Sequence, residues 1–187
     1  MRHARRILFS LVFCAAGTHV LSGQQLFDVN LNDRTGDTFK VTVYPEPLSS
    51  SNNVFQFAST APGTYEEMDI GRFVADFRAF DASGSEVPTE HTSTNEWTFS
   101  RPSDVRKITY TVADIWHAHV KDHPVLRMCS SVLTDDFAMI NGQAVFGYIA
   151  GMQSAPMKIR LACPPDWKIG TALTKDPEGY YEADDFD

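Results

Sequence analysis

The sequence from residue 61 to residue 82 reads APGTYEEMDIGRFVADFRAFDA. Pro62 and Gly63 favour a tight turn, because proline presets φ at the first corner of a turn and glycine accepts the positive φ of the second. A strand that precedes this turn must end at it, and Tyr65 is expected at the corner. The residues that follow fit either a helix face or a half-buried strand, and we interpret them as an irregular turn over 68–73 and then a strand to residue 80.

Apolar and polar side chains alternate in many short segments on both sides of this stretch, which is typical of strands with one buried face. This alternation predicts strands at residues 39–44, 53–58, 87–88, 95–99, 106–112, 157–161 and 169–173. The strands at 95–99 and 106–112 are expected to form a hairpin. Turn residues separate the segments and no amphipathic helix of ordinary length is evident. The sequence therefore predicts an all-β fold, a sandwich or large curved sheet of about ten short antiparallel strands.

The region from residue 114 to residue 149 is less periodic. We expect a loop followed by a strand over 125–130. Asn141 and Gly142 suit a type I′ turn, which needs positive φ at both central positions, so residues 137–140 and 144–149 are interpreted as two strands about that turn. A plain loop with a short helical turn before it is the alternative.

The first 23 residues have the features of an export signal, with basic residues before an apolar run from Ile7 to Ala16. We expect cleavage near Gln24 and a periplasmic or extracellular location. A membrane anchor is the alternative, although this run is short for a bilayer, which needs about 20 apolar residues. Residues 24–175 are expected to form one domain and residues 176–187 an acidic tail.

Charge and cysteine content limit the partners and the chemistry. The formal net charge of −8 argues against nucleic acid or an anionic membrane as a partner. Loss of Cys14 with the signal leaves Cys129 and Cys163, an even number in an oxidising compartment, and we expect a structural disulfide between them. Two buried thiols on neighbouring strands are the alternative.

Motifs for catalysis or cofactor binding are not found in the sequence, which has no His-Glu-x-x-His, Gly-x-Ser-x-Gly or glycine-rich phosphate loop. Two groups of side chains resemble sites but are better explained as solvated loops: the histidine cluster of His117, His119 and His123 with Asp114 and Asp122, and the carboxylates Glu66, Glu67 and Asp69. No catalytic, cofactor-binding or metal-binding residue is assigned. Of the three tryptophans, Trp97 and Trp167 are expected in the core, and Trp116 is the candidate for an exposed contact.

The order of these segments resembles the N-terminal domain of the M61 metallopeptidase family, the glycyl aminopeptidases. The resemblance covers nearly all of the chain after the signal, and its elements are 61–65, 72–77 leading to 80–84, 95–97, 108–112, 137–148, 159–161, 165–169 and 172–173. One departure lies at the corner, where the family prefers Trp-x-Pro-Gly and this chain has Thr60 and Ala61 before Pro62.

The resemblance implies a saddle-like β domain, similar to the N-terminal domain of M1 aminopeptidases, that precedes a zinc domain and a PDZ domain. Zinc and the residues that hold it would belong to that other domain, and we expect this chain to end near the junction. The implied partners are an M61-type catalytic domain, in cis or in trans, and a peptide substrate. Tyr65, Arg72 and Phe73 are the candidate cleft or interface residues. The alternatives are a secreted β-sandwich module that binds an extracellular protein or glycan, and a small hydrolase with an unrecognised site.

Overall fold

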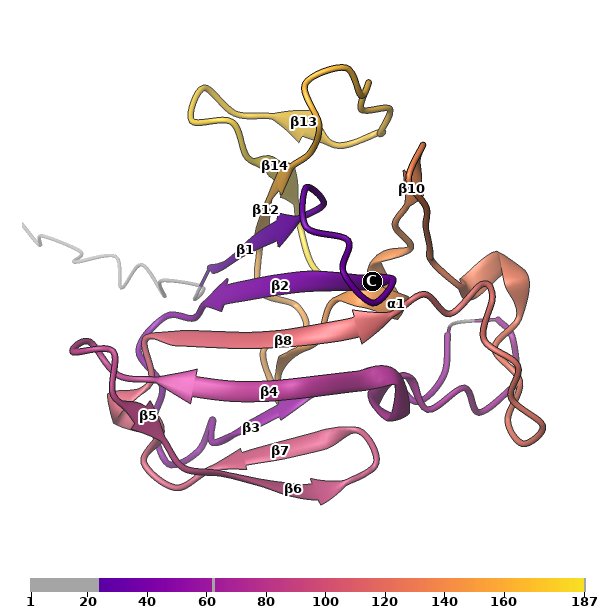
Figure 1. The fold of residues 1–187 in the computed structure, drawn as a ribbon. Helices are drawn as coiled ribbons and strands as arrows, with labels where there is room; N and C mark the ends of the chain where they lie inside the picture. The colour runs from indigo at the N-terminus through magenta and orange to yellow at the C-terminus, as the bar shows by residue number, and fades with distance from the viewer. Residues whose placement is uncertain (1–23, 62, 187) are drawn as a thin grey trace, which may run out of the picture.

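The computed structural model describes residues 24–61 and 63–186, and its main element is a mixed sheet of eight strands in the order β13-β14-β12-β1-β2-β8-β4-β5 (Figure 1). Its strands are β1 (Gln25–Asn30), β2 (Thr38–Tyr44), β4 (Val74–Phe80), β5 (Glu86–Val87), β8 (Lys107–Ala113), β12 (Met157–Ala162), β13 (Thr174–Lys175) and β14 (Tyr181–Ala183). β1 runs parallel to β12, whereas its pairing with β2 is antiparallel.

A smaller antiparallel sheet has four strands in the order β11-β3-β7-β6. Its strands are β3 (Val54–Gln56), β6 (Thr89–Ser93), β7 (Glu96–Phe99) and β11 (Tyr148–Ile149). β9 (Val132–Leu133) and β10 (Ala138–Met139) form a separate pair. Short helical turns connect these elements: η1 (Ile70–Phe73), η2 (Pro102–Asp104), η3 (Arg127–Cys129) and α1 (Gly142–Val145).

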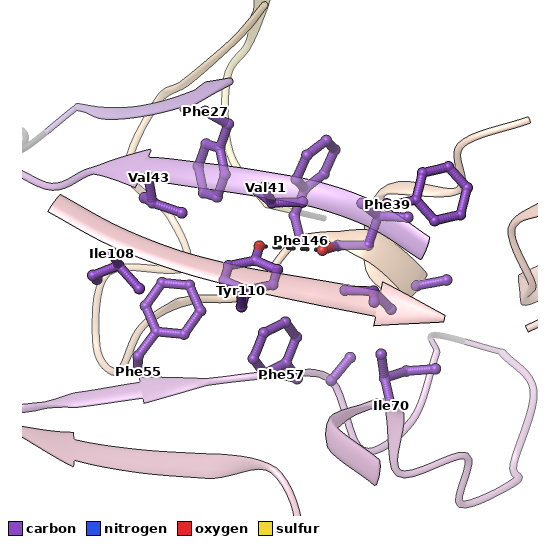
Figure 2. Close-up of a cluster of buried hydrophobic side chains, with 14 of the residues drawn as sticks. Phe27, Phe39, Val41, Val43, Phe55, Phe57, Ile70, Ile108, Tyr110 and Phe146 are labelled. Atoms are coloured by element: carbon purple, nitrogen blue, oxygen red, sulfur yellow. Dashed lines mark hydrogen bonds between the residues drawn. The ribbon is translucent and has the colours of Figure 1, made fainter. Parts of the chain in front are cut away.

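The hydrophobic core lies between the eight-stranded and four-stranded sheets (Figure 2). Alternate residues of β2 and β8 face it, because successive side chains of a strand point to opposite faces. Phe57 and Tyr110 meet edge to face, with 5.0 Å between their ring centroids. The buried Tyr110 hydroxyl donates to the carbonyl of Val145 at 3.1 Å and accepts from the N–H of Gly147 at 3.3 Å. Burial raises the pKa of Tyr110 far above its ordinary value, so the hydroxyl stays protonated.

The all-β prediction is confirmed: the alternating segments at 39–44 and 157–161 lie within β2 and β12, and the segment at 106–112 overlaps β8. The predicted turn over 68–73 followed by a strand is also confirmed, as η1 and β4. The structure differs from the prediction in having one parallel pairing and more strands than about ten.

The predicted hairpin of 95–99 with 106–112 is wrong. β7 pairs with β3 and β6, whereas β8 pairs with β2 and β4 in the other sheet. The reason lies in η2, which begins at Pro102 and separates the two strands where the chain passes from one layer to the other. Two strands that follow each other in sequence therefore face each other across the core.

Two predictions in the aperiodic region are also wrong. The strand expected over 125–130 is replaced by η3. The type I′ turn does not form, because Asn141 has a φ of −90° and the helical turn α1 begins at Gly142. Farther along the chain, the strand expected over 169–173 is absent and β13 begins only at Thr174.

The predicted acidic tail contributes to the sheet. β14 lies within it and pairs with β12 on one side and β13 on the other. The Lys158 ammonium is 2.8 Å from Asp176 and 3.2 Å from Glu182, so two of the acidic residues neutralise a lysine of the neighbouring strand. The expected boundary after residue 175 is therefore not an edge of the folded sheet.

The predicted disulfide is not formed, and Cys129 and Cys163 are both free. Cys129 ends η3 and is buried, whereas Cys163 follows β12 and is partly exposed. An even cysteine count predicts pairing but does not say whether the two cysteines lie close together, and Cys129 lies in η3 rather than on the strand predicted over 125–130. The predicted export signal, residues 1–23, lies outside the described residues. None of the helices in the described part of the chain has the length and apolar character that a membrane crossing requires.

Candidate functional site

The segment from Gly63 to Phe73, called the corner segment below, begins in a tight turn. The carbonyl of Ala61 accepts from the N–H of Thr64 at 3.2 Å and from its hydroxyl at 2.7 Å. Gly63 has a φ of 80°, as the turn prediction requires. Pro62 lies outside the described residues.

The tip of the corner segment is held out in solvent. Tyr65 has a φ of 59°, a left-handed conformation that is uncommon for a residue with a side chain, and its side chain is 99% exposed. The tip is anchored on the buried side chains of Met68 and Ile70. The N–H of Met68 also donates to the carbonyl of Ser59 at 2.7 Å. The phenol of Tyr65 is thus free to contact another molecule.

Asn95, which precedes β7, fixes the other end of the corner segment. Its side-chain oxygen accepts from the N–H of Gly71 at 2.9 Å, and its amide nitrogen donates to the Asp69 carboxylate at 2.8 Å. The approach is close, because a Cβ on Gly71 would lie 2.2 Å from the carbonyl oxygen of Thr94. Only glycine fits at this contact. The hydrogen bonds from Asn95 hold the backbone next to Arg72 and thereby position the Arg72 side chain.

Arg72 joins the corner segment to residues 114–124, called the histidine loop. Its guanidinium donates to the carbonyl of Asp122 at 2.6 Å and to the carbonyl of His123. The same guanidinium lies 4.8 Å from the centre of the Phe73 ring, a cation–π contact. His123 adds a second link, because its Nδ1 is 3.5 Å from a carboxylate oxygen of Glu67.

The histidine loop is organised by Asp114, whose carboxylate is nearly buried. One oxygen is 2.9 Å from Nδ1 of His117 and accepts from the N–H of Leu133 at 3.0 Å, while the other accepts from the N–H of His117 at 3.1 Å. These bonds satisfy a carboxylate that would be costly to bury alone. Across the described residues, no group of three or more His, Cys, Asp or Glu side chains is placed to hold a metal ion.

The structure brings Arg72 and Phe73 into contact and places Tyr65 apart from them at the exposed tip. The sequence interpretation did not identify Asn95 as the residue that positions them, although it lies in a segment that carried the family resemblance. Trp97 is buried as predicted, with its ring stacked on His91 at 4.2 Å and on Phe77 at 4.9 Å. The Trp116 ring is partly exposed and lies 4.9 Å from the guanidinium of Arg127.

The site offers a phenol, two carboxylates and an imidazole at one corner of a rigid β domain. These groups can bind a polar or aromatic surface, but the described residues bring no nucleophile and general base together there. The side chains of Tyr65, Glu66 and Glu67 are exposed, while hydrogen bonds hold the backbone of the segment beneath them.

Comparison with known proteins gives a similar fold and a matching family model. The fold is similar to that of an aminopeptidase N family protein from Idiomarina loihiensis, with a TM-score of 0.69 and 20% sequence identity. The match covers 87% of this chain and 27% of that protein, so the chain spans about a quarter of its length. No similar sequence was found among curated proteins. The family model described as the peptidase M61 N-terminal domain matches residues 26–187. The resemblance seen in the sequence is thereby confirmed, and the chain belongs to the peptidase M61 N-terminal domain family.

Proposed function

We propose that this domain is a non-catalytic accessory domain of an exported M61-type zinc aminopeptidase. In this role it packs on a zinc catalytic domain and forms part of the wall of the substrate cleft. The observation that carries the proposal is the family match over residues 26–187, because the M61 N-terminal domain belongs with an M61 catalytic domain. Zinc chemistry is not assigned to this chain, since its described residues do not form a metal-binding group.

The corner segment supports the cleft role. A surface that borders a substrate must hold its shape without a ligand, since ordering a loop on binding costs free energy. Asn95 and Arg72 supply that order here, through hydrogen bonds to the backbone of the corner segment and of the histidine loop. The exposed Tyr65 then presents an aromatic ring and a hydroxyl, the combination that is enriched in binding interfaces.

The test is a reconstitution with the catalytic domain of an M61 peptidase expressed without its own N-terminal domain. Hydrolysis of glycyl and alanyl anilides is measured with and without this chain. We expect the chain alone to release no product and to raise kcat/KM when it is added to the catalytic domain. Zinc-dependent hydrolysis by the isolated chain would contradict the non-catalytic role.

Tyr65→Ala tests the cleft role separately, with Tyr44→Ala as the matched control. Both tyrosines are exposed, but Tyr44 ends β2 and is remote in sequence and position from the corner segment. We expect Tyr65→Ala to raise KM about 5–30-fold in the reconstituted enzyme, the effect of about 1–2 kcal/mol of lost binding. Equal kinetic constants for the two variants would show that Tyr65 does not contribute to the substrate cleft.

Export is tested by fusing residues 1–23 to a reporter enzyme that is active only outside the cytoplasm. We expect activity from the fusion and none when Ile7 to Ala16 is interrupted by two aspartates, because the apolar run is what a signal peptide requires. Activity retained by the interrupted run would contradict the export proposal.

A further inference from the structure

A second surface, away from the corner segment, carries most of the exposed apolar side chains. The described residues include seven large apolar side chains that are exposed. Five of them make up what we call the apolar face: Met128, Phe137, Met139, Ile169 and Leu173. Met128 is 78% exposed and Phe137 54% exposed, which is costly for side chains of this size in water.

Each of these five residues lines one of two hollows, or adjoins or is hydrogen-bonded to a residue that does. Met128 lies beside the start of α1, because the Asn141 side chain donates to its carbonyl at 3.0 Å. Asn141 and Leu173 both line a hollow of about 480 Å³. A second hollow of about 330 Å³ lies between Phe137 and Trp167, two residues before Ile169. In Figure 1, β10 lies on the same side of β2 as β13 and β14.

The first hollow, of about 480 Å³, exists because no element fully covers the core-facing side of the eight-stranded sheet at β12 and β14. Over β4 and β8 the four-stranded sheet closes the core, as the stacked rings of Phe77 and Trp97 show. Beneath β1 the cover comes from α1, which is followed by Phe146, and the Phe146 ring lies 5.1 Å from that of Phe27. α1 has only four residues. Tyr181 and Ala183 of β14 therefore line an open hollow.

Acidic side chains border the apolar face. Asp135 and Asp136 are exposed at the turn between β9 and β10, Asp166 is exposed beside the second hollow, and Asp185 lines the first. An apolar centre with a charged border is the usual anatomy of a protein interface. The complementary surface is one with apolar side chains in the middle and Lys or Arg at its edge.

We propose that the apolar face is the surface on which an M61 catalytic domain docks, through an apolar patch bordered by Lys and Arg. The inference rests on the function proposed above and identifies where the contact is made. The position of the last residues of the family domain supports a catalytic domain as the partner at this face. The family match runs to residue 187, and Asp185 and Phe186 line the hollow. In a protein where a catalytic domain follows this one, that domain starts at the apolar face.

The experiment measures binding of the chain to an M61 catalytic domain that lacks its own N-terminal domain, by titration calorimetry. The test variants are the pair Phe137→Ser with Met139→Ser, and separately Leu173→Ser. Tyr44→Ser is the matched control, because Tyr44 is exposed and lies outside both the apolar face and the corner segment. Circular dichroism and thermal melting establish that each variant is folded.

We expect the Phe137 and Met139 pair and Leu173→Ser to weaken binding at least tenfold, and Tyr44→Ser to change it less than threefold. Raised salt is expected to weaken binding of the wild-type chain, since it screens the acidic border. Hydrogen exchange supplies a readout that does not depend on substitution. Amides of residues 137–139 and 169–173 should become protected in the complex.

Two results would overturn the inference, and they are distinguishable. If the wild-type chain fails to bind the catalytic domain, the proposed function falls and the inference falls with it. If the wild-type chain binds and the apolar-face variants bind equally well, the function stands and the location is wrong. Sedimentation of the chain alone completes the test, because a dimer abolished by Leu173→Ser without loss of catalytic-domain binding would make this surface a contact between two copies.

Discussion

Gly71 shows how a single residue controls the corner segment. Its Cβ position lies 2.2 Å from the Thr94 carbonyl oxygen and 2.7 Å from the Asn95 Cα, and both are backbone atoms that cannot rotate away. We expect Gly71→Ala to lower the free energy of unfolding by about 1–3 kcal/mol, the range for overpacking in a tightly packed region. Urea denaturation of the purified domain provides the measurement.

Gly170→Ala is the matched control for Gly71→Ala. No atom lies within 4 Å of a Cβ at Gly170, so we expect its stability to stay within about 0.5 kcal/mol of wild type. Equal stability of the two variants would show that β6 and β7 do not restrain the corner segment as described. Reconstituted peptidase activity should fall for Gly71→Ala in parallel, because Arg72 follows directly.

Tyr110 has a comparable role in the core. Phenylalanine at this position keeps the ring contacts but leaves the Val145 carbonyl and the Gly147 N–H without this partner. We expect Tyr110→Phe to cost about 1–3 kcal/mol, the penalty for buried groups left unsatisfied. Tyr44→Phe, at an exposed tyrosine, should change stability by less than about 0.5 kcal/mol. Chemical denaturation curves with equal slopes would allow the two values to be compared directly.

At the scale of elements, the ion pair of Lys158 with Asp176 ties β12 to the turn between β13 and β14. The Asp176 carboxylate also accepts from the N–H groups of Glu178 at 2.9 Å and Tyr180 at 2.8 Å. The hydrogen bond from Lys158 holds the pKa of Asp176 below its ordinary value of 3.8. The folded chain therefore binds a proton at Asp176 less readily than the unfolded chain does.

The sign of the pH dependence follows from this lowered pKa. The stability contributed by Asp176 is fully present above pH 3.8 and is lost as the pH falls through the lowered pKa of the folded state. Asp176→Asn should be less stable at neutral pH and should show a shallower loss of stability in acid. Thermal melting between about pH 2 and 7 gives the slope, and the exposed Asp184→Asn serves as the control. An unchanged acid slope in Asp176→Asn would refute the pairing.

The elements that sequence alternation predicted are those with one buried and one exposed face. Phe39, Val41 and Val43 point into the core from β2 while the residues between them do not, and this is the pattern from which the strand was inferred. Alternation carries no information about partners, so β7 and β8 were paired wrongly. The short apolar run around Ala144 and Val145 fits a strand or a helical turn equally, and burial of both residues in α1 decided between them.

The candidate site was predictable only in part, because some of its features depend on residues that are distant in the sequence. The turn at Gly63 follows from local chemistry and was correctly predicted. Arg72, in contrast, binds two backbone carbonyls about 50 residues away in the chain, and carbonyl acceptors have no signature in the sequence. The left-handed φ of Tyr65 is likewise imposed by the anchors at Met68 and Ile70 rather than by tyrosine itself.

At the scale of the whole molecule, the last strands are part of the folded unit. β14 covers the outer edge of β12, and removing it exposes the backbone of Met157 to Ile159. We expect a chain ending at residue 173 to be less stable by several kcal/mol, about the cost of losing a strand pair and its packing. A chain ending at residue 184, which retains β14, is the control. Comparable melting temperatures for the two would mean that the sheet ends at β12.

The parallel pairing of β1 with β12 determines when this fold can be completed. Gln25 lies opposite Met157, so this edge of β1 has no partner until nearly the whole chain has been synthesised. Such long-range contacts give a high contact order and slow folding, because the entropy of closing the loop is lost before the contacts form. At roughly 5–20 residues per second, a nascent chain waits on the order of ten seconds with one edge of its first strand open. During that interval β1 is a template for pairing with other chains, so this edge is where misassembly during synthesis would begin.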